Sequence, residues 1–209
     1  MTPASAGYEV TVEGAGAASV ERRTRETQVR VALRLAGEGL AEIETGIGFY
    51  DHLLASLAHH ALFDLEVRAS GDLAVDEHHT VEDVALVLGT ALGAALGERA
   101  GIARFGDAAV PMDEAVATAV VDVGGRPYAV VDLPFRGERA GTLPLQLVDH
   151  ALEALARTAG VTLHLRGTGR NDHHLAEAAF KALGRALRAA CEPDPRRGGA
   201  VASTKGRLG

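Results

Sequence analysis

The chain has 209 residues, of which 47% are hydrophobic and only 4% aromatic, and it carries a formal net charge of -7 with a pI of about 5.7. This length allows one large domain or two small ones, with a core built from Ala, Val and Leu. The acidic balance argues against a nucleic-acid partner or an anionic membrane surface, since both favour a basic face. The single cysteine, Cys191, excludes an intrachain disulfide. We see neither a secretory signal nor an apolar run long enough to span a bilayer, so we expect a cytoplasmic protein.

The first half of the chain predicts strands and two helices. Residues 27–35, "TQVRVALRL", alternate apolar and polar side chains as a half-buried strand does. An apolar pattern of helical period follows from Tyr50, and Leu65–Arg68 alternates again. A glycine-containing turn then leads to "DEHHTVEDV", where the histidines of an HHxxE motif open a second apolar run.

The second half repeats this order. Residues 116–133, "VATAVVDVGGRPYAVVDL", predict two strands, and Gly124–Pro127 between them predicts a hairpin turn. An Asp-His pair recurs at Asp149–His150, as at residues 51–52, and a strand is expected at Leu163–Arg166. A second HHxxE motif follows in "NDHHLAEAA".

These observations predict an α+β fold of two tandem βαβα-type repeats packed into one unit, with mixed sheets that carry helices on one side. Neither repeat would bury both faces of its elements alone. We expect one catalytic domain over residues 1–209, with repeats at about 8–100 and 101–195 and a C-terminal substrate-binding tail at 196–209.

The HHxxE motif suits metal binding when it opens a helix. His78 and Glu82 are then four residues apart, lie on one face and are close enough to hold one ion. His79 is rotated by about 100° around the helix axis and is free to serve another ion. The second motif repeats this geometry.

The two Asp-His pairs add one histidine from each half. The ligands can be divided into two equivalent sites, each with three histidines and one glutamate. Exchanging corresponding residues of the two halves converts one site into the other. One site comprises His52, His79, His173 and Glu177, and the other comprises His150, His174, His78 and Glu82. Imidazole with carboxylate suits Mn, Fe, Co, Ni or Zn better than Mg or Ca. The absence of a cysteine ligand argues against a structural zinc site.

The chain resembles the imidazoleglycerol-phosphate dehydratase family, over roughly residues 8–208. The resemblance rests on "GIGFYDHLL", "DEHHTVEDV", "GIARFG", "PMDEA", "GRPY", "QLVDH", "NDHHLAEAAFKALGRAL" and "STKG", in this order. It implies a fold like that of ribosomal protein S5 domain 2. It also implies dehydration of D-erythro-imidazole-glycerol phosphate to imidazole-acetol phosphate, in histidine biosynthesis.

The resemblance implies two Mn²⁺ ions per active site, held by the eight residues grouped above. It further implies self-association into a 24-subunit shell, with active sites built from neighbouring subunits. The metals would act as Lewis acids that favour the substrate ring as imidazolate.

The resemblance also implies residues for substrate binding and catalysis. Glu26 in "RRTRETQ" matches a glutamate that the family places near the substrate, and it is our candidate for the base. His60 matches a histidine near the ligand, and Arg104 and Arg126 match arginines on the phosphate side. Lys181 lies one helical turn beyond Glu177 and faces the same side.

The tail residues Ser203, Thr204 and Lys205 are chemically suited to an oxyanion. Asp113 and Glu114 receive no assignment; they could support a metal ligand or start a helix. Three alternatives remain: a dinuclear hydrolase of phosphorylated substrates, a metal-storing shell, and a family member that has lost activity, against which the intact ligand set argues. The arginines and lysine on the phosphate side argue against storage, which has no need of them.

Overall fold

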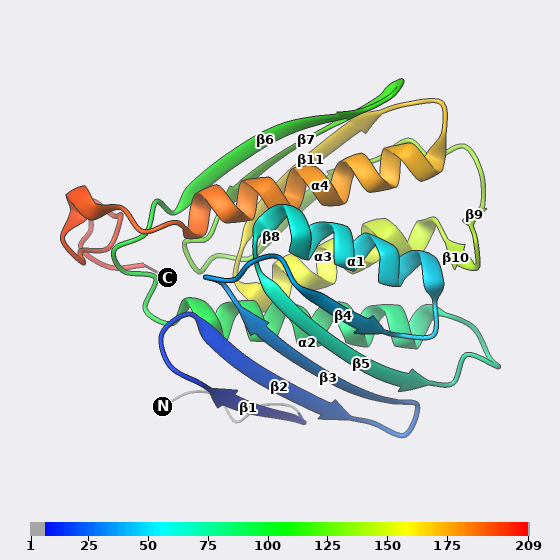
Figure 1. Cartoon of the computed structure of the whole chain (residues 1–209), viewed down its shortest axis with the longest axis horizontal. Helices are drawn as coiled ribbons and strands as arrows, with labels where there is room; N and C mark the ends of the chain where they lie inside the picture. The colour runs from blue at the N-terminus through cyan, green and yellow to red at the C-terminus, as the bar shows by residue number, and fades with distance from the viewer. Residues whose placement is uncertain (1–6, 209) are drawn as a thin grey trace.

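The described residues form two mixed sheets and four α-helices. The helices lie between the sheets, as Figure 1 shows. The computed structural model describes residues 7–208. The α+β architecture with helices on one side of each sheet is therefore confirmed. Both sheets turn their helix-covered faces inward, and the helices of one half pack on those of the other.

The first half forms a five-stranded sheet of order β1-β2-β3-β5-β4. Strand β4 is parallel to β5, and the other neighbours are antiparallel. The elements are β1 (Tyr8–Val12), β2 (Ala17–Arg23), β3 (Thr27–Arg34), β4 (Ala41–Glu44), α1 (Gly48–Ala61), β5 (Asp64–Gly71) and α2 (His78–Leu96).

The second half forms a four-stranded sheet of order β6-β7-β11-β8, with β8 parallel to β11. A short β9–β10 pair forms a separate ribbon. The elements are β6 (Phe105–Met112), β7 (Ala115–Asp122), β8 (Tyr128–Asp132), β9 (Arg139–Ala140), β10 (Leu143–Pro144), α3 (Gln146–Ala159), β11 (Thr162–Thr168), α4 (Asp172–Cys191) and the 3₁₀ turn η1 (Pro195–Arg197).

The hairpin expected at Gly124–Pro127 is wrong. Strands β7 and β8 are consecutive in the chain, but β11 lies between them in the sheet. Strand β8 pairs in parallel with β11, as β4 pairs with β5 in the first half. The loop therefore crosses the end of β11 rather than reversing the chain into an adjacent strand. Turn residues mark a change of direction but do not say which strand becomes the neighbour.

Small residues allow the helices to pack closely between the sheets. The structure buries Ala at many helix positions, among them Ala58, Ala91, Ala156 and Ala182. Close approach removes apolar surface from water even though each side chain is small. Packing of this kind explains how a chain with few aromatic residues still builds one continuous core.

Helix α2 passes a simple length and composition test for crossing a membrane. The apolar run in its sequence covers residues 84–97, whereas the helix itself is 19 residues long. The structure buries 72% of its apolar window inside the molecule, against α3 and strands β2 and β3. The central helix of a two-sheet protein has this composition because both of its faces are covered.

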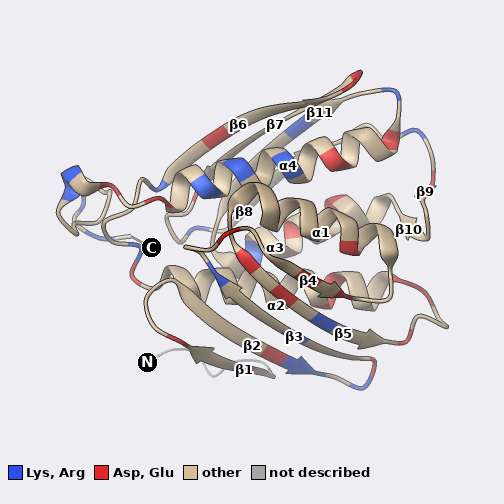
Figure 2. Cartoon of the chain, viewed as in Figure 1, with Lys and Arg blue, Asp and Glu red and all other residues tan. Residues whose placement is uncertain are grey.

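All four helices begin at one end of the helix layer, the right-hand end in Figure 1, and the C-terminal tail lies at the opposite end. This follows from the topology, because each helix is preceded by a strand or loop that runs to the same end. Charge follows this polarity on α4, where Figure 2 shows acidic residues toward the start and basic residues toward the end. Such a distribution complements the helix dipole. Both HHxxE motifs and both Asp-His pairs thus lie at one end of the molecule.

Candidate metal centre

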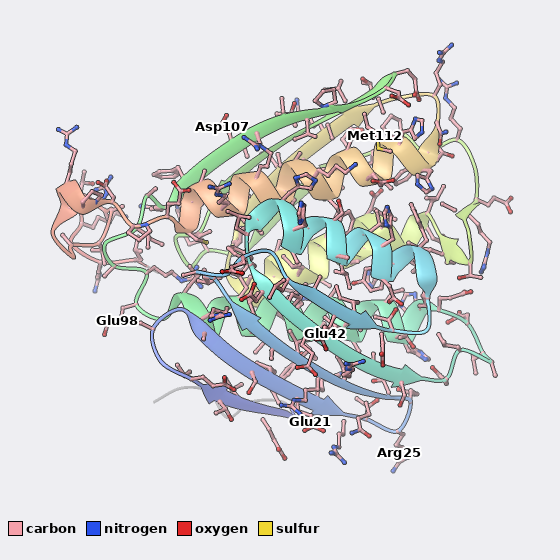
Figure 3. All side chains as sticks on the ribbon, viewed as in Figure 1. Glu21, Arg25, Glu42, Glu98, Asp107 and Met112 are labelled. Atoms are coloured by element: carbon pink, nitrogen blue, oxygen red, sulfur yellow. The ribbon has the colours of Figure 1, made fainter. Side chains whose placement is uncertain are left out.

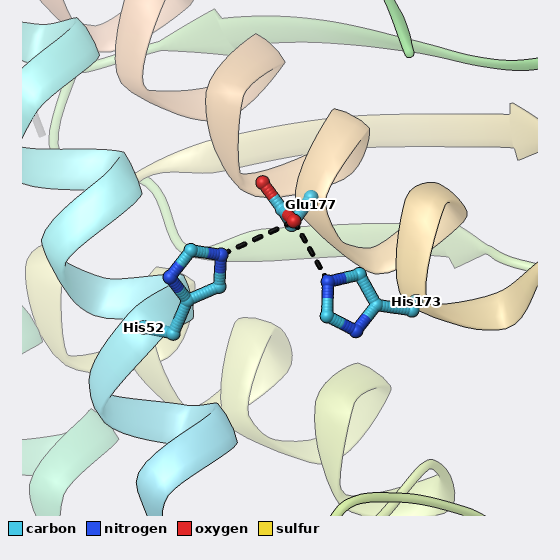
Figure 4. A group of neighbouring side chains, drawn as sticks. All are labelled: His52, His173 and Glu177. Atoms are coloured by element: carbon cyan, nitrogen blue, oxygen red, sulfur yellow. Dashed lines mark hydrogen bonds and ion pairs between the residues drawn. The ribbon is translucent and has the colours of Figure 1, made fainter. Parts of the chain in front are cut away.

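The first group of candidate metal ligands joins α1 to α4. Figure 4 shows His52 from α1 and His173 from α4 on either side of Glu177. The Nε2 atoms of His52 and His173 lie 3.1 Å and 2.8 Å from Glu177 Oε1. All three ligand atoms lie within 4.8 Å of one another, a spacing that one ion can bridge.

Glu177 is held as a carboxylate by its surroundings. It is buried, and burial alone favours the neutral acid. Hydrogen bonds and charge from Lys181 and His52 outweigh this and lower the pKa of Glu177 to about 2. Lys181 Nζ lies 2.7 Å from Glu177 Oε2, so each carboxylate oxygen has a cationic or imidazole partner. A permanently ionised carboxylate is the form that binds a metal.

The second group joins α2 to α3 and has the same composition. It consists of His78 and Glu82 from α2 and His150 from α3, again within 4.8 Å of one another. His150 Nε2 lies 3.4 Å from Glu82 Oε1, and His78 Nε2 lies 3.9 Å from Glu82 Oε2. These separations are wider than hydrogen bonds. His150 Nε2 is buried without a hydrogen-bond partner among the described residues. A buried nitrogen atom without such a partner is expected where its partner is a metal ion.

The donor set of each group fits a first-row divalent metal. Two imidazoles and one carboxylate provide a facial set of nitrogen and oxygen donors that leaves further positions open. Both groups contain ligands from both halves of the chain, because α1 packs on α4 and α2 packs on α3. The packing of the halves therefore creates both groups.

The remaining two histidines of the predicted sets, His79 and His174, lie outside these groups. His79 Nδ1 lies 3.1 Å from Asp72 Oδ2, and His174 Nδ1 lies 2.9 Å from Glu114 Oε2. The hydrogen bond that His79 donates to Asp72 is the largest cause of the raised pKa of His79. One chain thus brings together three of the four ligands expected in each site.

Glu26 lies in the β2–β3 turn, at the same end of the molecule as the helix starts. Figure 3 labels its neighbour Arg25 in this turn. The negative charge of Glu26 contributes, after the Asp72 hydrogen bond, to the raised pKa of His79. Its backbone N–H donates to Thr24 Oγ1, which shapes the turn. Among residues 7–208, no hydrogen bond or ion pair reaches the Glu26 carboxylate.

His60 and Lys181 lie near the first group. Burial, followed by the charges of His59 and Lys181, lowers the pKa of His60. Lys181 spans from Glu177 to Met112, whose Sδ lies 3.5 Å from Nζ. Figure 3 marks Met112 beside α4. These two predicted substrate residues therefore share the surroundings of Glu177.

Arg104 and the tail lie at the far end of the molecule. The Arg104 guanidinium donates to both carboxylate oxygens of Asp122, at 2.7 Å and 2.9 Å, and to the carbonyl oxygen of Ala202 at 2.6 Å. Its backbone N–H donates to Ala190 O, at the end of α4. Since a helix rises 1.5 Å per residue, His173 at the start of α4 is about 25 Å away.

Arg126 and the tail residues also lie at the end of the molecule where the helices end. Arg126 is exposed, and its carbonyl accepts from Thr162 Oγ1 beside the C-terminal end of α3. Ser203, Thr204 and Lys205 follow the segment that Arg104 holds, and Ser203 Oγ accepts from the Lys205 N–H. One chain therefore does not bring Arg104 and the tail residues to its own metal groups.

Two acidic residues near the site, Asp72 and Glu114, were not assigned from the sequence. Glu114 lies in the β6–β7 turn and starts no helix. A hydrogen bond from His174, then backbone hydrogen bonds from Asn171 and Arg170, lower the pKa of Glu114 to about 2. Glu114 comes just before strand β7, which packs on the helix that the second HHxxE motif opens. The sequence alone does not reveal this packing, because it depends on the sheet register.

Comparisons with known proteins point to one family over nearly the whole chain. Residues 45–187 match the sequence signature of imidazoleglycerol-phosphate dehydratase. A protein of this name from Methanoculleus marisnigri is 56% identical over 90% of this chain and 97% of its own length. A chloroplastic relative from Arabidopsis thaliana is 53% identical over 90% of this chain and 70% of its own.

Solved structures agree with the sequence comparisons. The crystal structure of imidazoleglycerol-phosphate dehydratase from Staphylococcus aureus superposes with a TM-score of 0.76 at 32% identity, covering 84% of this chain and 99% of that chain. The enzyme from Pyrococcus furiosus gives a TM-score of 0.77 at 36% identity, covering 90% and 99%.

Proposed function

The chain belongs to the imidazoleglycerol-phosphate dehydratase family, and is thus a hydro-lyase of histidine biosynthesis; from this premise we propose its reaction, metal and assembly. The reaction is the removal of water from D-erythro-imidazole-glycerol phosphate to give imidazole-acetol phosphate. The metal is Mn²⁺, two ions per active site. The observation that carries the proposal is the pair of matched groups, each with two histidines and one glutamate from both halves.

The proposal includes a fourth ligand for each ion from a neighbouring copy of the chain. His79 would complete a group made of His52, His173 and Glu177, and His174 would complete the other. Each of these two histidines is partly exposed, 41% and 24% for the side chains, and has one ring nitrogen engaged by a carboxylate. Both are therefore accessible from outside the chain through the other ring nitrogen.

The far placement of the phosphate-side residues supports the same assembly. Arg104 lies about 25 Å from His173 of its own chain, and the residues Ser203–Lys205 follow the segment that Arg104 holds, too far for one small substrate. A neighbouring copy would present them to a site whose metal ligands come from other copies. We propose a closed shell of 24 subunits, each with a single catalytic domain of two repeats and the tail 196–209.

The residues of the chain divide the chemistry among them. When bound, Mn²⁺ would supply Lewis acidity that favours the ionised imidazole ring, and the ionised ring helps the hydroxyl on the ring-attached carbon to leave. Glu26 takes the proton from the middle carbon of the glycerol chain, since no hydrogen bond or ion pair engages its carboxylate among residues 7–208. Transfer of this proton to the departing hydroxyl releases water and leaves an enol at the middle carbon, which tautomerises to the ketone.

Lys181 and His60 orient the substrate near the first group. Lys181 already holds Glu177 and can turn one of its three donors toward the substrate. The arginines and the tail of a neighbouring copy would bind the phosphate through charge-assisted hydrogen bonds. Phosphate held at one end and imidazole at the other would fix the reacting carbons beside Glu26.

The test is an activity assay on the full chain. The protein is stripped with a chelator, Mn²⁺ is added back, and formation of imidazole-acetol phosphate is followed. Activity that returns only with metal supports the proposal. Release of inorganic phosphate instead of the ketone would favour the hydrolase alternative. Two bound ions without either product would retain the metal centre but contradict the proposed reaction.

A further inference from the structure

Glu26 and Glu114 occupy corresponding positions of the two repeats. In the first sheet Gln28 pairs with Ser70 of β5, and in the second Val116 pairs with Thr168 of β11. The buried positions Val29, Val31 and Leu33 of β3 correspond to Ala117, Ala119 and Val121 of β7. In this register the residue just before β3 is Glu26, and the residue just before β7 is Glu114.

In the second half this glutamate fixes a metal-site histidine. Glu114 Oε2 lies 2.9 Å from His174 Nδ1. Glu114 Oε1 accepts the backbone N–H groups of Arg170 and Asn171, at 3.0 Å and 2.7 Å. Asn171 in turn caps α4 and accepts the backbone N–H groups of residues 173 and 174. The two carboxylate oxygens thus have separate, fixed tasks.

In the first half a different residue does this work. Asp72, in the loop between β5 and α2, lies 3.1 Å from His79 Nδ1. Glu26 is near enough to His79 to affect it electrostatically, yet its carboxylate has no hydrogen bond or ion pair within residues 7–208. The same position of the repeat therefore holds a fixed glutamate in one half and an unpaired one in the other.

We propose that Glu114 and Asp72 are positioning residues that set the tautomer of His174 and His79. Each carboxylate accepts Nδ1–H, which leaves the Nε2 lone pair to bind a metal. Because Asp72 does this in the first half, Glu26 is left available for proton transfer. The inference rests on the proposed role of both histidines as metal ligands.

The fixed orientation of Glu114 makes Glu114→Gln a directed test. The backbone donors at residues 170 and 171 must face the amide oxygen, so the amide nitrogen must face His174 Nδ1. An N–H donor there requires Nδ1 to be the acceptor, and the ring then carries its proton on Nε2, where it blocks metal binding. Glu114→Ala removes the carboxylate but imposes no tautomer, since water can accept from Nδ1.

A purely structural role of Glu114 and a positioning role predict opposite rankings of the two variants by the damage they cause. If Glu114 only ties the β6–β7 turn to α4, alanine does more damage than glutamine, because it loses both backbone contacts. If Glu114 sets the tautomer, Glu114→Gln binds Mn²⁺ more weakly than Glu114→Ala while unfolding at a higher temperature. We expect a 10- to 100-fold loss of Mn²⁺ affinity for Glu114→Gln.

Two measurements on the full chain decide the matter. Solid-state NMR of the metal-free protein with ¹⁵N-labelled histidine, above the imidazole pKa, reports the tautomer of His174, which the His174→Gln spectrum assigns. Electron paramagnetic resonance of free Mn²⁺ reports affinity. Asp113→Asn is the matched control, because it changes the same charge in the same turn at a residue that is 80% exposed and 4.0 Å from His174. It should leave both readouts unchanged.

A Glu114→Gln protein that keeps Nδ1–H and wild-type Mn²⁺ affinity would overturn the inference. A switched tautomer in a chain whose wild type binds no Mn²⁺ would instead support the assignment of Glu114 and contradict the proposed metal function. Asp72 has no backbone donors that fix its orientation among the described residues, so an amide there can turn its oxygen to His79. Asp72→Asn should therefore weaken Mn²⁺ binding less than Glu114→Gln.

Discussion

The two halves of the chain pack on each other through matched contacts, and their glycines show this most clearly. A Cβ atom at Gly89 of α2 would lie 2.4 Å from Leu155 O, and one at Gly184 of α4 would lie 2.6 Å from Leu57 O. Leu155 and Leu57 occupy the same position of helices α3 and α1. The close helix packing, and with it the arrangement of the two groups of candidate metal ligands, is thus shared by the two halves.

The surroundings of the ligands differ more than the ligands do. Glu177 is buried and held by Lys181, whereas Glu82 is more exposed and its nearest cation, Arg157, is 3.7 Å away. Asp51 accepts hydrogen bonds from Thr45, but its counterpart Asp149 has an oxygen without a partner among the described residues. The two halves therefore share the arrangement of the candidate ligands but differ in the hydrogen bonds and charges around them.

The largest expected effect comes from removing either ligand glutamate. Glu177→Gln and Glu82→Gln should each reduce dehydration roughly a thousandfold, because a Lewis-acid contribution of several kcal/mol needs both ions. Steady-state rates at saturating Mn²⁺ and metal content per chain check this. Equal losses would support equivalent sites. A variant at Glu82 that retains full activity would show that only the first group matters.

Glu26→Gln tests whether Glu26 has a different function from Glu114, its counterpart in the second repeat. We expect kcat to fall about 100-fold, as for loss of a general base, with Mn²⁺ content unchanged. Glu98→Gln is the control, since Glu98 lies at the opposite end of the molecule in Figure 3. Loss of bound Mn²⁺ in Glu26→Gln, without a specific effect on kcat, would assign Glu26 to the metal site rather than to proton transfer.

Alanine at the two matched glycines tests the contact between the halves. Gly89→Ala and Gly184→Ala should each lower the free energy of unfolding by about 1–3 kcal/mol, through overpacking. Gly89→Ala should have the larger effect, because its Cβ would also lie 2.1 Å from Thr158 Oγ1. Urea unfolding measures both.

Gly48→Ala is the control for these variants, since no atom lies within 4 Å of its Cβ position. It should not destabilise the protein. Unchanged stability in both Gly89→Ala and Gly184→Ala would mean that the helices separate readily and that the halves are less tightly joined than the structure indicates.

The smallest effect concerns the aspartates before the two metal-site histidines. Burial first, then the charges of Glu153 and Asp132, raise the pKa of Asp149 to about 6. Its stabilising contribution is present below the ordinary carboxyl pKa of 3.8 and is lost as pH rises through about 6. In the metal-stripped protein at neutral pH, Asp149→Asn should therefore gain about 1–2 kcal/mol, allowing for solvent screening.

The gain should vanish as the pH falls below 4, which unfolding curves across this range will show. Asp51→Asn should do the opposite and destabilise the protein at neutral pH, because Thr45 donates two hydrogen bonds to this carboxylate. The same sign for both variants would contradict the difference drawn between the halves.

Much of the fold follows from local patterns in the sequence. Alternation at residues 27–35 and the helical period after each Asp-His pair predict elements that the structure contains. The repeat itself predicts that helices of the two halves pack together. The order of strands was not predictable from turn residues, as the crossing at Gly124–Pro127 shows, because neighbours in a sheet are set by pairing far along the chain.

The candidate site divides in the same way. His78 with Glu82, and His173 with Glu177, are neighbours through helix periodicity alone. His52 and His150 join them only because α1 packs on α4 and α3 on α2. The contacts of Asp72 and Glu114 depend on loop and turn geometry, and the distance from Arg104 to the metal groups depends on the direction of α4. Neither is encoded in local spacing.

The most direct test of two ions held between copies is native mass spectrometry of the full chain, stripped of metal and then reloaded with Mn²⁺. It reports the mass of the assembly and the number of ions per chain together. The account predicts two Mn²⁺ ions per chain in an assembly of many copies. One of the two ions should be lost more readily from His79→Gln assemblies than from wild type, and the other more readily from His174→Gln assemblies. A single chain that binds both ions and catalyses the dehydration alone would contradict it.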